Sequence, residues 1–162
     1  MKQELENEIE NSIKILCKKI NETNTEKLLA IGFVITDDVQ NVVAKLLFEG
    51  DLPDNSETYQ TLSPVEWASS EKEAFVALNN LLYTLKNATR ENQFNYKEWV
   101  GRIFDAFMTT LTYLDLRKSF GESLYLTFAG VDPNSILEEE EKRFVRAMNS
   151  SLVFEQWCVE FD

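Results

Sequence analysis

The chain has 162 residues, of which 44% are hydrophobic and 12% aromatic, which is enough for one domain with a substantial core and too little for two. Its 28 acidic residues outnumber 16 lysines and arginines, and the formal net charge of -12 disfavours nucleic acids and anionic membranes as partners. Histidine is absent, which excludes Ser/His and Cys/His nucleophile pairs and imidazole metal sites.

The chain begins with an amphipathic helix, predicted over 2–21. Apolar residues recur there at three- and four-residue steps, namely Leu5, Ile9, Ile13, Leu16 and Ile20. Glutamates crowd the start of this segment and lysines its end, an order that complements the helix dipole. We therefore expect one side of this helix to face the core and the other to face water.

Residues 28–35 are apolar at successive positions, which is typical of an interior strand, and we expect this strand to be central. Asp37 and Asp38 follow it and predict a turn. Adjacent carboxylates also suit a metal ion, but no further ligand with recognisable spacing follows, so we favour the turn. Residues 41–48 fit both an alternating strand and a helical stripe, and periodicity leaves the two open.

The word Ser63-Pro64-Val65-Glu66-Trp67 marks the junction between a strand-rich first half and a helical second half. Its spacing predicts a capping box, in which the Ser63 side chain and Glu66 satisfy each other's backbone amides and Pro64 opens a helix. On this basis Ser63→Ala is expected to cost about 1 kcal/mol. Trp67 would anchor the first helical turn against the sheet. Residues 58–62, just before the word, are predicted to form a short strand.

The second half of the chain is predicted to be helical apart from one strand. Asn95 followed by Glu98 marks one helix start, and Asp132 with Pro133 marks another. The predicted elements are helices over 71–87, 95–121, 132–148 and 152–161 and a strand over 124–129. Together these elements predict a single α+β domain over 1–162, with a small, mostly antiparallel sheet covered by helices.

The two cysteines, Cys17 and Cys158, lie far apart in the sequence and within apolar-periodic segments. This pattern predicts two reduced, buried thiols and no disulfide framework. No stretch approaches the roughly 20 apolar residues of a membrane span, and the amino terminus lacks a signal-peptide pattern. We therefore expect a cytoplasmic protein.

The residues left for enzyme chemistry are the thiols and four acids, Asp37, Asp38, Glu66 and Asp132. Each acid has a local structural role as a turn or cap residue. The sequence holds no glycine-rich phosphate loop, no Cys-x-x-Cys word and no nucleophile elbow. We expect no catalytic residue, no metal site and no cofactor.

At Ser63-Pro64-Val65-Glu66-Trp67 the sequence resembles an uncharacterised bacterial family, the domain of unknown function 4303 family, whose members carry an S-P-x-E-W word mid-chain. The order of strands and helices around the word is also similar. The resemblance implies a bacterial protein and favours a strand over 41–47. No activity is established for the family, so no catalytic residue carries over. An immunity role beside a toxin is a hypothesis for small acidic bacterial proteins in general.

These features favour a non-catalytic protein-binding domain with a basic partner, such as the toxin of an immunity pair. The residues predicted to bind are Asp37, Glu66, Trp67 and Tyr59, with Tyr96 as a further exposed aromatic candidate. The alternative is a small-ligand-binding or enzymatic domain with a pocket near Trp67 and Asp37. A structural homo-oligomer is a third hypothesis, and the sequence leaves the oligomeric state open.

Overall fold

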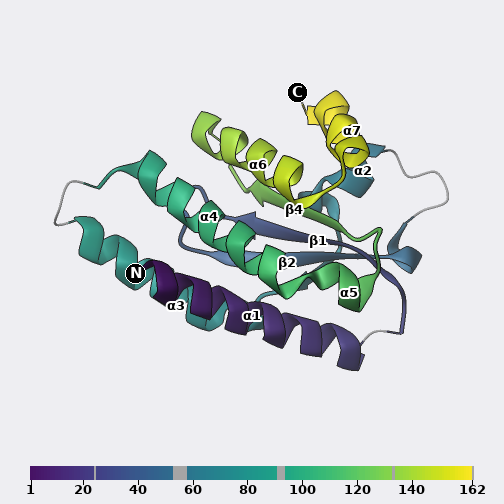
Figure 1. Ribbon diagram of the computed structural model, residues 1–162, viewed down its shortest axis with the longest axis horizontal. Coiled ribbons are helices and arrows are strands. Elements are labelled where there is room, and N and C mark those ends of the chain that lie inside the picture. Colours follow the sequence, from purple (N-terminus) through teal and green to yellow (C-terminus); the bar gives the residue numbers. More distant parts are fainter. Residues whose placement is uncertain (24, 53–57, 91–93, 133, 162) are drawn as a thin grey trace.

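The structure is a computed structural model that describes residues 1–23, 25–52, 58–90, 94–132 and 134–161. These residues form one α+β domain in which helices cover a four-stranded sheet (Figure 1), and this confirms the predicted fold class. The helices are α1 (Lys2–Thr23), α2 (Thr58–Leu62), α3 (Val76–Arg90), α4 (Tyr96–Leu114), α5 (Leu116–Phe120), α6 (Ser135–Met148) and α7 (Ser151–Phe161). The strands are β1 (Leu28–Ile35), β2 (Val42–Phe48), β3 (Ser69–Glu71) and β4 (Tyr125–Gly130), and single 3-10 turns are η1 (Glu49–Asp51), η2 (Pro64–Glu66) and η3 (Glu73–Phe75).

The sheet is mixed, with strand order β3-β2-β1-β4. β2 pairs with β1 and with β3 in antiparallel fashion, whereas β4 runs parallel to β1. The predicted central strand is therefore confirmed, and residues 42–48 form a strand. Because β1 and β4 are parallel neighbours, their carboxyl ends meet at one edge of the sheet. This edge positions the candidate site described below.

The core on one face of the sheet is a cluster of phenylalanines around Phe33 of β1. Its ring centroid lies between 5.2 and 6.5 Å from those of Phe75, Phe107, Phe128 and Phe144. These rings come from β4, α4, α6 and η3, so one strand residue joins elements from most of the chain. Edge-to-face and tilted contacts of this kind add to the free energy of burial.

α1 packs against α3 and α4 with the apolar stripe predicted for it. All five stripe residues are buried, with exposed fractions of 4% or less, namely Leu5, Ile9, Ile13, Leu16 and Ile20. Neither cysteine is part of a disulfide, but both are half-buried and not fully buried as predicted. Burial raises the pKa of the Cys17 thiol to about 11, so this thiol is a poor nucleophile at neutral pH.

The opposite face of the sheet has a smaller core, which explains the Ser63–Trp67 word. Pro64 of η2 and the Trp67 side chain lie directly against Gly32 of β1. The capping box is wrong: the Ser63 side chain forms no cap hydrogen bond, and η2 ends after one turn before β3 begins. The cost expected for Ser63→Ala on that ground therefore no longer follows. Packing of the word on the sheet has overridden its local preference for a longer helix.

Three further features differ from the prediction. The segment 58–62 is helix α2 and not a strand. The N-cap of α6 is Asn134, whose Oδ1 accepts from the amides of Ile136 and Leu137, so Asp132 is not the cap. Pro133 lies outside the described residues. The helix predicted over 95–121 is interrupted at Asp115, which has a left-handed backbone with φ of 47°.

The predicted start of α4 is confirmed, because Asn95 Oδ1 accepts from the Glu98 amide. The strand predicted over 124–129 is β4, and the short last helix is α7. In the part of the chain that the structure describes, no helix has both the length and the apolar character needed to cross a membrane.

Candidate functional site

The loop over 36–41 leaves the sheet beside the end of β4. Ile35 pairs with Gly130 in the parallel register, and the Val131 amide donates to the Ile35 carbonyl at 2.9 Å. The predicted turn at Asp37 and Asp38 is confirmed and lies at this edge, together with Asp132, which follows β4. Carboxyl ends of parallel strands are a common place for binding sites.

The loop contains one residue, Val39, whose backbone is strained. Val39 has φ of 55°, a left-handed backbone that β-branched residues rarely adopt, and its side chain is fully buried. Such strain costs roughly 1–3 kcal/mol and persists only where the surroundings enforce it. The Val39 amide donates to the Thr36 carbonyl at 2.8 Å, and Thr36 Oγ1 donates to Asp38 Oδ1 at 2.6 Å. The loop is therefore a rigid part of the fold.

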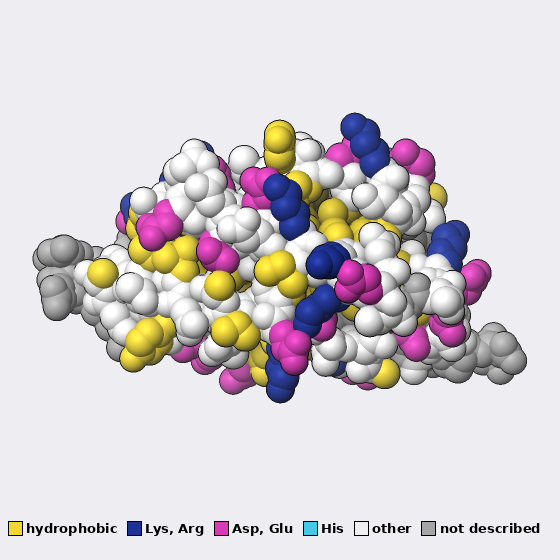
Figure 2. Space-filling model, turned by 90° about the horizontal axis from the view of Figure 1, so that it is seen from below, with side chains coloured by type: hydrophobic (Ala, Val, Ile, Leu, Met, Phe, Trp, Pro, Cys, Tyr) yellow, Lys and Arg dark blue, Asp and Glu magenta, His cyan; other side chains and the backbone are white. Residues whose placement is uncertain are grey.

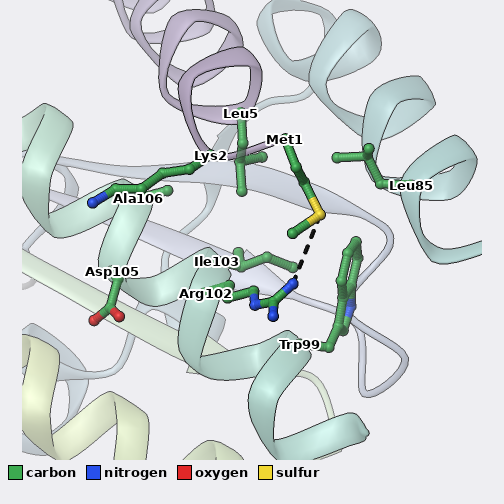
Figure 3. A pocket seen from close by; sticks show the side chains of 9 residues that line it. All are labelled: Met1, Lys2, Leu5, Leu85, Trp99, Arg102, Ile103, Asp105 and Ala106. Carbon is green, nitrogen blue, oxygen red and sulfur yellow. Dashed lines mark hydrogen bonds between the residues drawn. The ribbon is translucent and has the colours of Figure 1, made fainter. Parts of the chain in front are cut away.

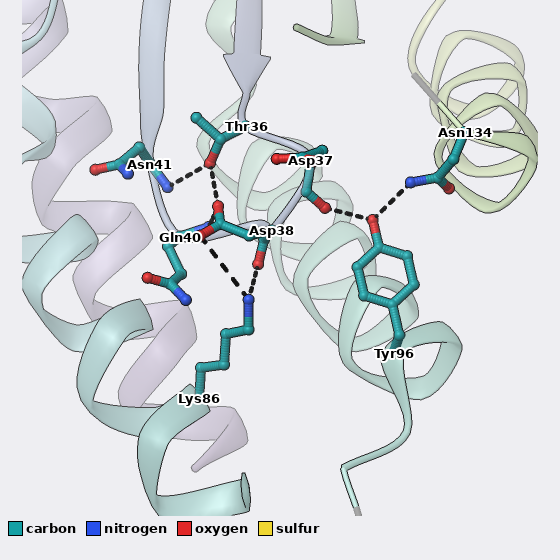
Figure 4. Close-up of polar contacts among 8 residues, drawn as sticks. All are labelled: Thr36, Asp37, Asp38, Gln40, Asn41, Lys86, Tyr96 and Asn134. Atoms are coloured by element: carbon teal, nitrogen blue, oxygen red, sulfur yellow. Dashed lines mark hydrogen bonds and ion pairs between the residues drawn. The ribbon is translucent and has the colours of Figure 1, made fainter. Parts of the chain in front are cut away.

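Two side chains from neighbouring helices bind the carbonyls of this loop (Figure 4). Lys86 of α3 is 4% exposed, and its Nζ donates to the Asp38 carbonyl at 2.6 Å. Tyr96 of α4 donates its hydroxyl to the Asp37 carbonyl at 2.6 Å and accepts from Asn134 Nδ2 at 3.0 Å. Helices α3, α4 and α6 are thus tied to the loop through these hydrogen bonds.

The buried ammonium of Lys86 is balanced within the same loop. Its Nζ lies 3.9 Å from Asp38 Oδ2 and 5.6 Å from the centroid of the Phe94 ring. A buried cation is tolerated only where hydrogen bonds and an opposite charge replace its hydration. The Asp38 carboxylate therefore balances the charge of Lys86, whereas the Asp37 carboxylate is exposed.

Three exposed carboxylates belong to segments that meet at this end of the sheet, which lies at the left of Figure 1. They are Asp37 in the loop, Asp132 after β4 and Glu138 in the first turn of α6, and we call them the acidic edge. Within the described residues none of the three forms an ion pair. Glu139, their neighbour on α6, does pair, with Lys97 at 3.7 Å. Among the described residues, the acidic edge therefore presents negative charge that has no ion-pair partner.

A fourth carboxylate, Glu141, lies behind the acidic edge. Its Oε1 accepts from the Gly130 amide at 2.5 Å, which connects α6 to the end of β4. The pKa of Glu141 is raised from its ordinary 4.5 to about 7, mainly by burial and to a smaller extent by the charge of Glu138, while the hydrogen bond from Gly130 opposes the shift. The negative charge at this end of the molecule therefore depends on pH near neutrality.

The predicted site residues other than Asp37 lie elsewhere. Trp67 is 3% exposed, its Nε1 donates to the Gln60 carbonyl at 3.0 Å, and it packs on the sheet, so its visible role is structural. Glu66 is exposed and, with Trp67, lines a cavity of about 250 Å³ whose other walls are Leu47, Asp51, Leu52, Gln60 and Ala68. Asp37 is not among these residues. Tyr59 belongs to α2, but its side chain is outside what the structure describes.

The chemistry available at the acidic edge is recognition of positive charge. Across the described residues, no group of three or more cysteines, aspartates and glutamates is placed to hold a metal ion. The hydroxyl of Tyr96 is engaged by Asp37 and Asn134, and Thr36 is engaged by Asp38. The carboxylates remain, fixed on a rigid loop and a helix end, where they can accept hydrogen bonds from lysines and arginines.

The sequence analysis did not identify the side chains that hold the loop of the candidate site in place. Lys86 continues the stripe of Leu78 and Leu82 in α3 at four-residue spacing, and this position was a signal that the lysine is buried. Tyr96 was identified as an exposed aromatic, whereas it is half-buried and its hydroxyl holds the loop. The left-handed backbone of Val39 has no signal in the sequence, because valine is disfavoured in that conformation.

No family model, curated protein or solved structure matches this chain. The resemblance carried by Ser63–Trp67 therefore remains a prediction, and what the site can do rests on its own geometry.

Proposed function

We propose that the protein is a non-catalytic binding domain that recognises a basic protein through the acidic edge of Asp37, Asp132 and Glu138. The observation that carries this proposal is the set of three exposed carboxylates that have no ion-pair partner among the described residues and lie on a frame held by hydrogen bonds. A rigid frame loses little conformational entropy on binding. Charge complementarity between the two proteins is then expected to raise their association rate.

A comparison of charge pairing at the acidic edge and on another face of the molecule supports this proposal. Figure 2 shows the face over α1 and α3, where basic, acidic and apolar side chains are interspersed. Lys19 of α1 lies 3.1 Å from Glu71 and 2.7 Å from Glu73, so charges there are neutralised locally. Within the described residues the three carboxylates of the acidic edge have no such pairing, and the net charge of -12 adds a long-range field that attracts cations.

The partner that we propose is a basic toxin, which would make this chain an immunity protein of a bacterial cytoplasm. The acidic composition and the S-P-x-E-W resemblance support this form of the proposal. Toxins that act on nucleic acids carry basic surfaces, because they must bind the phosphate backbone. An acidic edge is complementary to such a surface.

The test is a capture experiment with three matched baits. The edge variant carries Asp37→Asn, Asp132→Asn and Glu138→Gln, and the control variant carries Glu122→Gln, Glu155→Gln and Glu160→Gln. The control positions are exposed, and Glu122 precedes β4, at the end of this strand opposite to Asp132. Both variants lose three negative charges, so they differ only in where the charge is lost.

We expect one basic protein to be recovered from the source cell by the wild-type and control baits and to be lost with the edge bait. A captured protein that is neutral or acidic, or one that the edge bait retains as well as the control bait, would contradict the proposal.

A further inference from the structure

The acidic edge is built from two separate segments of the chain. Asp37 lies in the loop after β1, whereas Asp132 and Glu138 flank the start of α6. Charge-assisted hydrogen bonds depend on distance and angle, so such a surface discriminates between partners only where the spacing of its carboxylates is defined. A side chain that joins the two segments therefore bears on what the acidic edge can bind.

Tyr96 of α4 joins the two segments (Figure 4). Its hydroxyl donates to the Asp37 carbonyl at 2.6 Å and accepts from Asn134 Nδ2 at 3.0 Å. A tyrosine hydroxyl has a single hydrogen to donate, and Tyr96 donates it to the loop while its oxygen accepts from α6. One oxygen atom of Tyr96 thus lies within hydrogen-bond distance of both segments.

Asn134 connects Tyr96 to the first turn of α6. Its Oδ1 accepts from the amides of Ile136 and Leu137, both at 3.1 Å, and its Nδ2 donates to Tyr96. The carbonyl of Asn134 accepts from the Glu138 amide at 2.9 Å. Hydrogen bonds through Asn134 therefore connect the Tyr96 hydroxyl with the backbone of Glu138.

The ring of Tyr96 is held by the core of the domain. It is half-buried and packs against the main core cluster. It also continues the buried stripe of α4 at three- and four-residue steps, followed by Val100, Ile103 and Phe107, which are fully buried. A tyrosine has only two rotatable side-chain angles, so a packed ring places its hydroxyl at a defined point.

The helix that carries Tyr96 is also packed on a side that is remote from the acidic edge. There Trp99 and Ile103 of α4 lie opposite Leu5 of α1 and Leu85 of α3, around a pocket of about 320 Å³ (Figure 3). Trp99 and Ile103 are buried, and no residue of the acidic edge lines this pocket. The position of α4 therefore depends on core contacts, and the two segments of the acidic edge are bonded to it through Tyr96.

We propose that Tyr96 is the positioning residue of the acidic edge and that it sets the spacing of the lysine and arginine side chains which this edge accepts. The inference rests on the proposed function and adds its specificity: the carboxylates attract a basic protein, and Tyr96 determines which basic surface fits closely. The Tyr96 hydroxyl is uncharged, so its removal keeps the net charge of -12 and the long-range attraction. Only the close fit is lost.

The first experiment needs no partner and follows the Asp37 carbonyl ¹³C signal of the full chain by NMR. Tyr96→Phe removes the donor to this carbonyl. Asn134→Ser keeps a side-chain oxygen for the cap of α6 but removes the donor to Tyr96, with no change of charge. We expect both variants to shift the signal upfield, because hydrogen bonds in a chain polarise one another and the Asp37 carbonyl loses polarisation in each.

The double variant tests whether Tyr96 transmits the effect of Asn134. Asn134→Ser should produce no further shift of the Asp37 signal in the Tyr96→Phe background, since the two changes break the same connection. A change of the cap that acts within α6 alone would move the signals of residues 135–138 and leave that of Asp37 in place. An unmoved Asp37 signal in Asn134→Ser therefore overturns the inference.

The second experiment measures binding kinetics with the captured partner. Tyr113→Phe is the matched control, because it is the same chemical change near the other end of α4, at a side chain that is 78% exposed. We expect Tyr96→Phe to dissociate about 10-fold faster than the wild type, with an association rate and a salt dependence within about 2-fold of it. Tyr113→Phe should match the wild type in both rates.

The outcomes separate this inference from the proposed function. Failure to capture a basic protein contradicts the proposed function and, with it, the specificity assigned to Tyr96. With the partner in hand, a dissociation rate of Tyr96→Phe equal to that of Tyr113→Phe overturns the inference alone. Faster dissociation at an unchanged association rate supports it, because a loss of folded protein would lower the amount bound without changing the dissociation rate.

Discussion

Gly32 of β1 and Pro64 of η2 are in such close contact that a Cβ atom at position 32 would lie 2.3 Å from the Cβ of Pro64. The same atom would lie 3.0 Å from Cζ3 of Trp67. The Ser63–Trp67 segment therefore packs its one-turn helix η2 and the Trp67 indole directly on the middle of the central strand β1. Its role is packing, and only a residue without a side chain at position 32 permits it.

The first prediction is that Gly32→Ala destabilises the domain by about 1–3 kcal/mol, because neither the proline ring nor the sheet can yield easily. Gly101→Ala is the matched control. Gly101 lies inside α4, and a Cβ there would meet only Glu140 Oε1 at 3.8 Å, so this change should stabilise by about 0.5–1 kcal/mol. Urea unfolding measures both. Equal stability of Gly32→Ala and the wild type would contradict the close contact.

The second prediction concerns the start of α6. Asn134→Ala should lower the free energy of unfolding by about 1 kcal/mol, because the Asn134 side chain accepts from two amides of the first turn and donates to Tyr96. Asp132→Ala should change it by less than about 0.5 kcal/mol, since Asp132 is exposed and is not the cap. Thermal melts of the two variants decide between them. A larger loss for Asp132→Ala would restore the cap position expected from the sequence.

The third prediction is a pH dependence located at Glu141. Its pKa is about 7 in the folded protein and near 4.5 when unfolded, so the folded state binds more protons between these values. The contribution of Glu141 to stability is therefore complete below about pH 4.5 and is lost as the pH rises through 7. Glu141→Gln removes the charge and keeps an acceptor for the Gly130 amide.

Glu141→Gln should accordingly match the wild type at pH 4 and exceed its stability at pH 8 by roughly 1–3 kcal/mol. Denaturant unfolding at both pH values measures this difference, in which the other titrating groups largely cancel. A difference that is the same at pH 4 and pH 8 would show that Glu141 titrates normally.

Much of this fold follows from local patterns in the sequence. The apolar stripe of α1, the apolar run of β1 and the Asn95 cap of α4 each predict one type of local structure, and the structure confirms these three predictions. These elements are determined by periodicity and by hydrogen bonds within a few residues. The sequence does not show that β4 runs parallel to β1, because that pairing depends on how the intervening helices pack.

The failures have a common cause in contacts between distant segments. Ser63 and Glu66 have the spacing of a capping box, yet the fit of Pro64 against Gly32 decides the structure. An isolated glycine within a strand pattern indicates close approach of another segment, so Gly32 was the available signal. Asp37 was correctly identified as a turn residue, but the side chains that hold its loop, Lys86 and Tyr96, lie far away in the sequence.

The central claim is that the acidic edge directs the association with a basic protein. Its most direct test is the association rate constant with the captured partner, measured for the wild type, the edge variant and the control variant at about 50 and 200 mM salt. We expect the wild-type and control rates to fall several-fold at the higher salt, with little change in dissociation. The edge variant should associate about 10-fold more slowly at low salt and respond less to salt. Identical rates for the edge and control variants, or a wild-type rate that ignores salt, would contradict the claim.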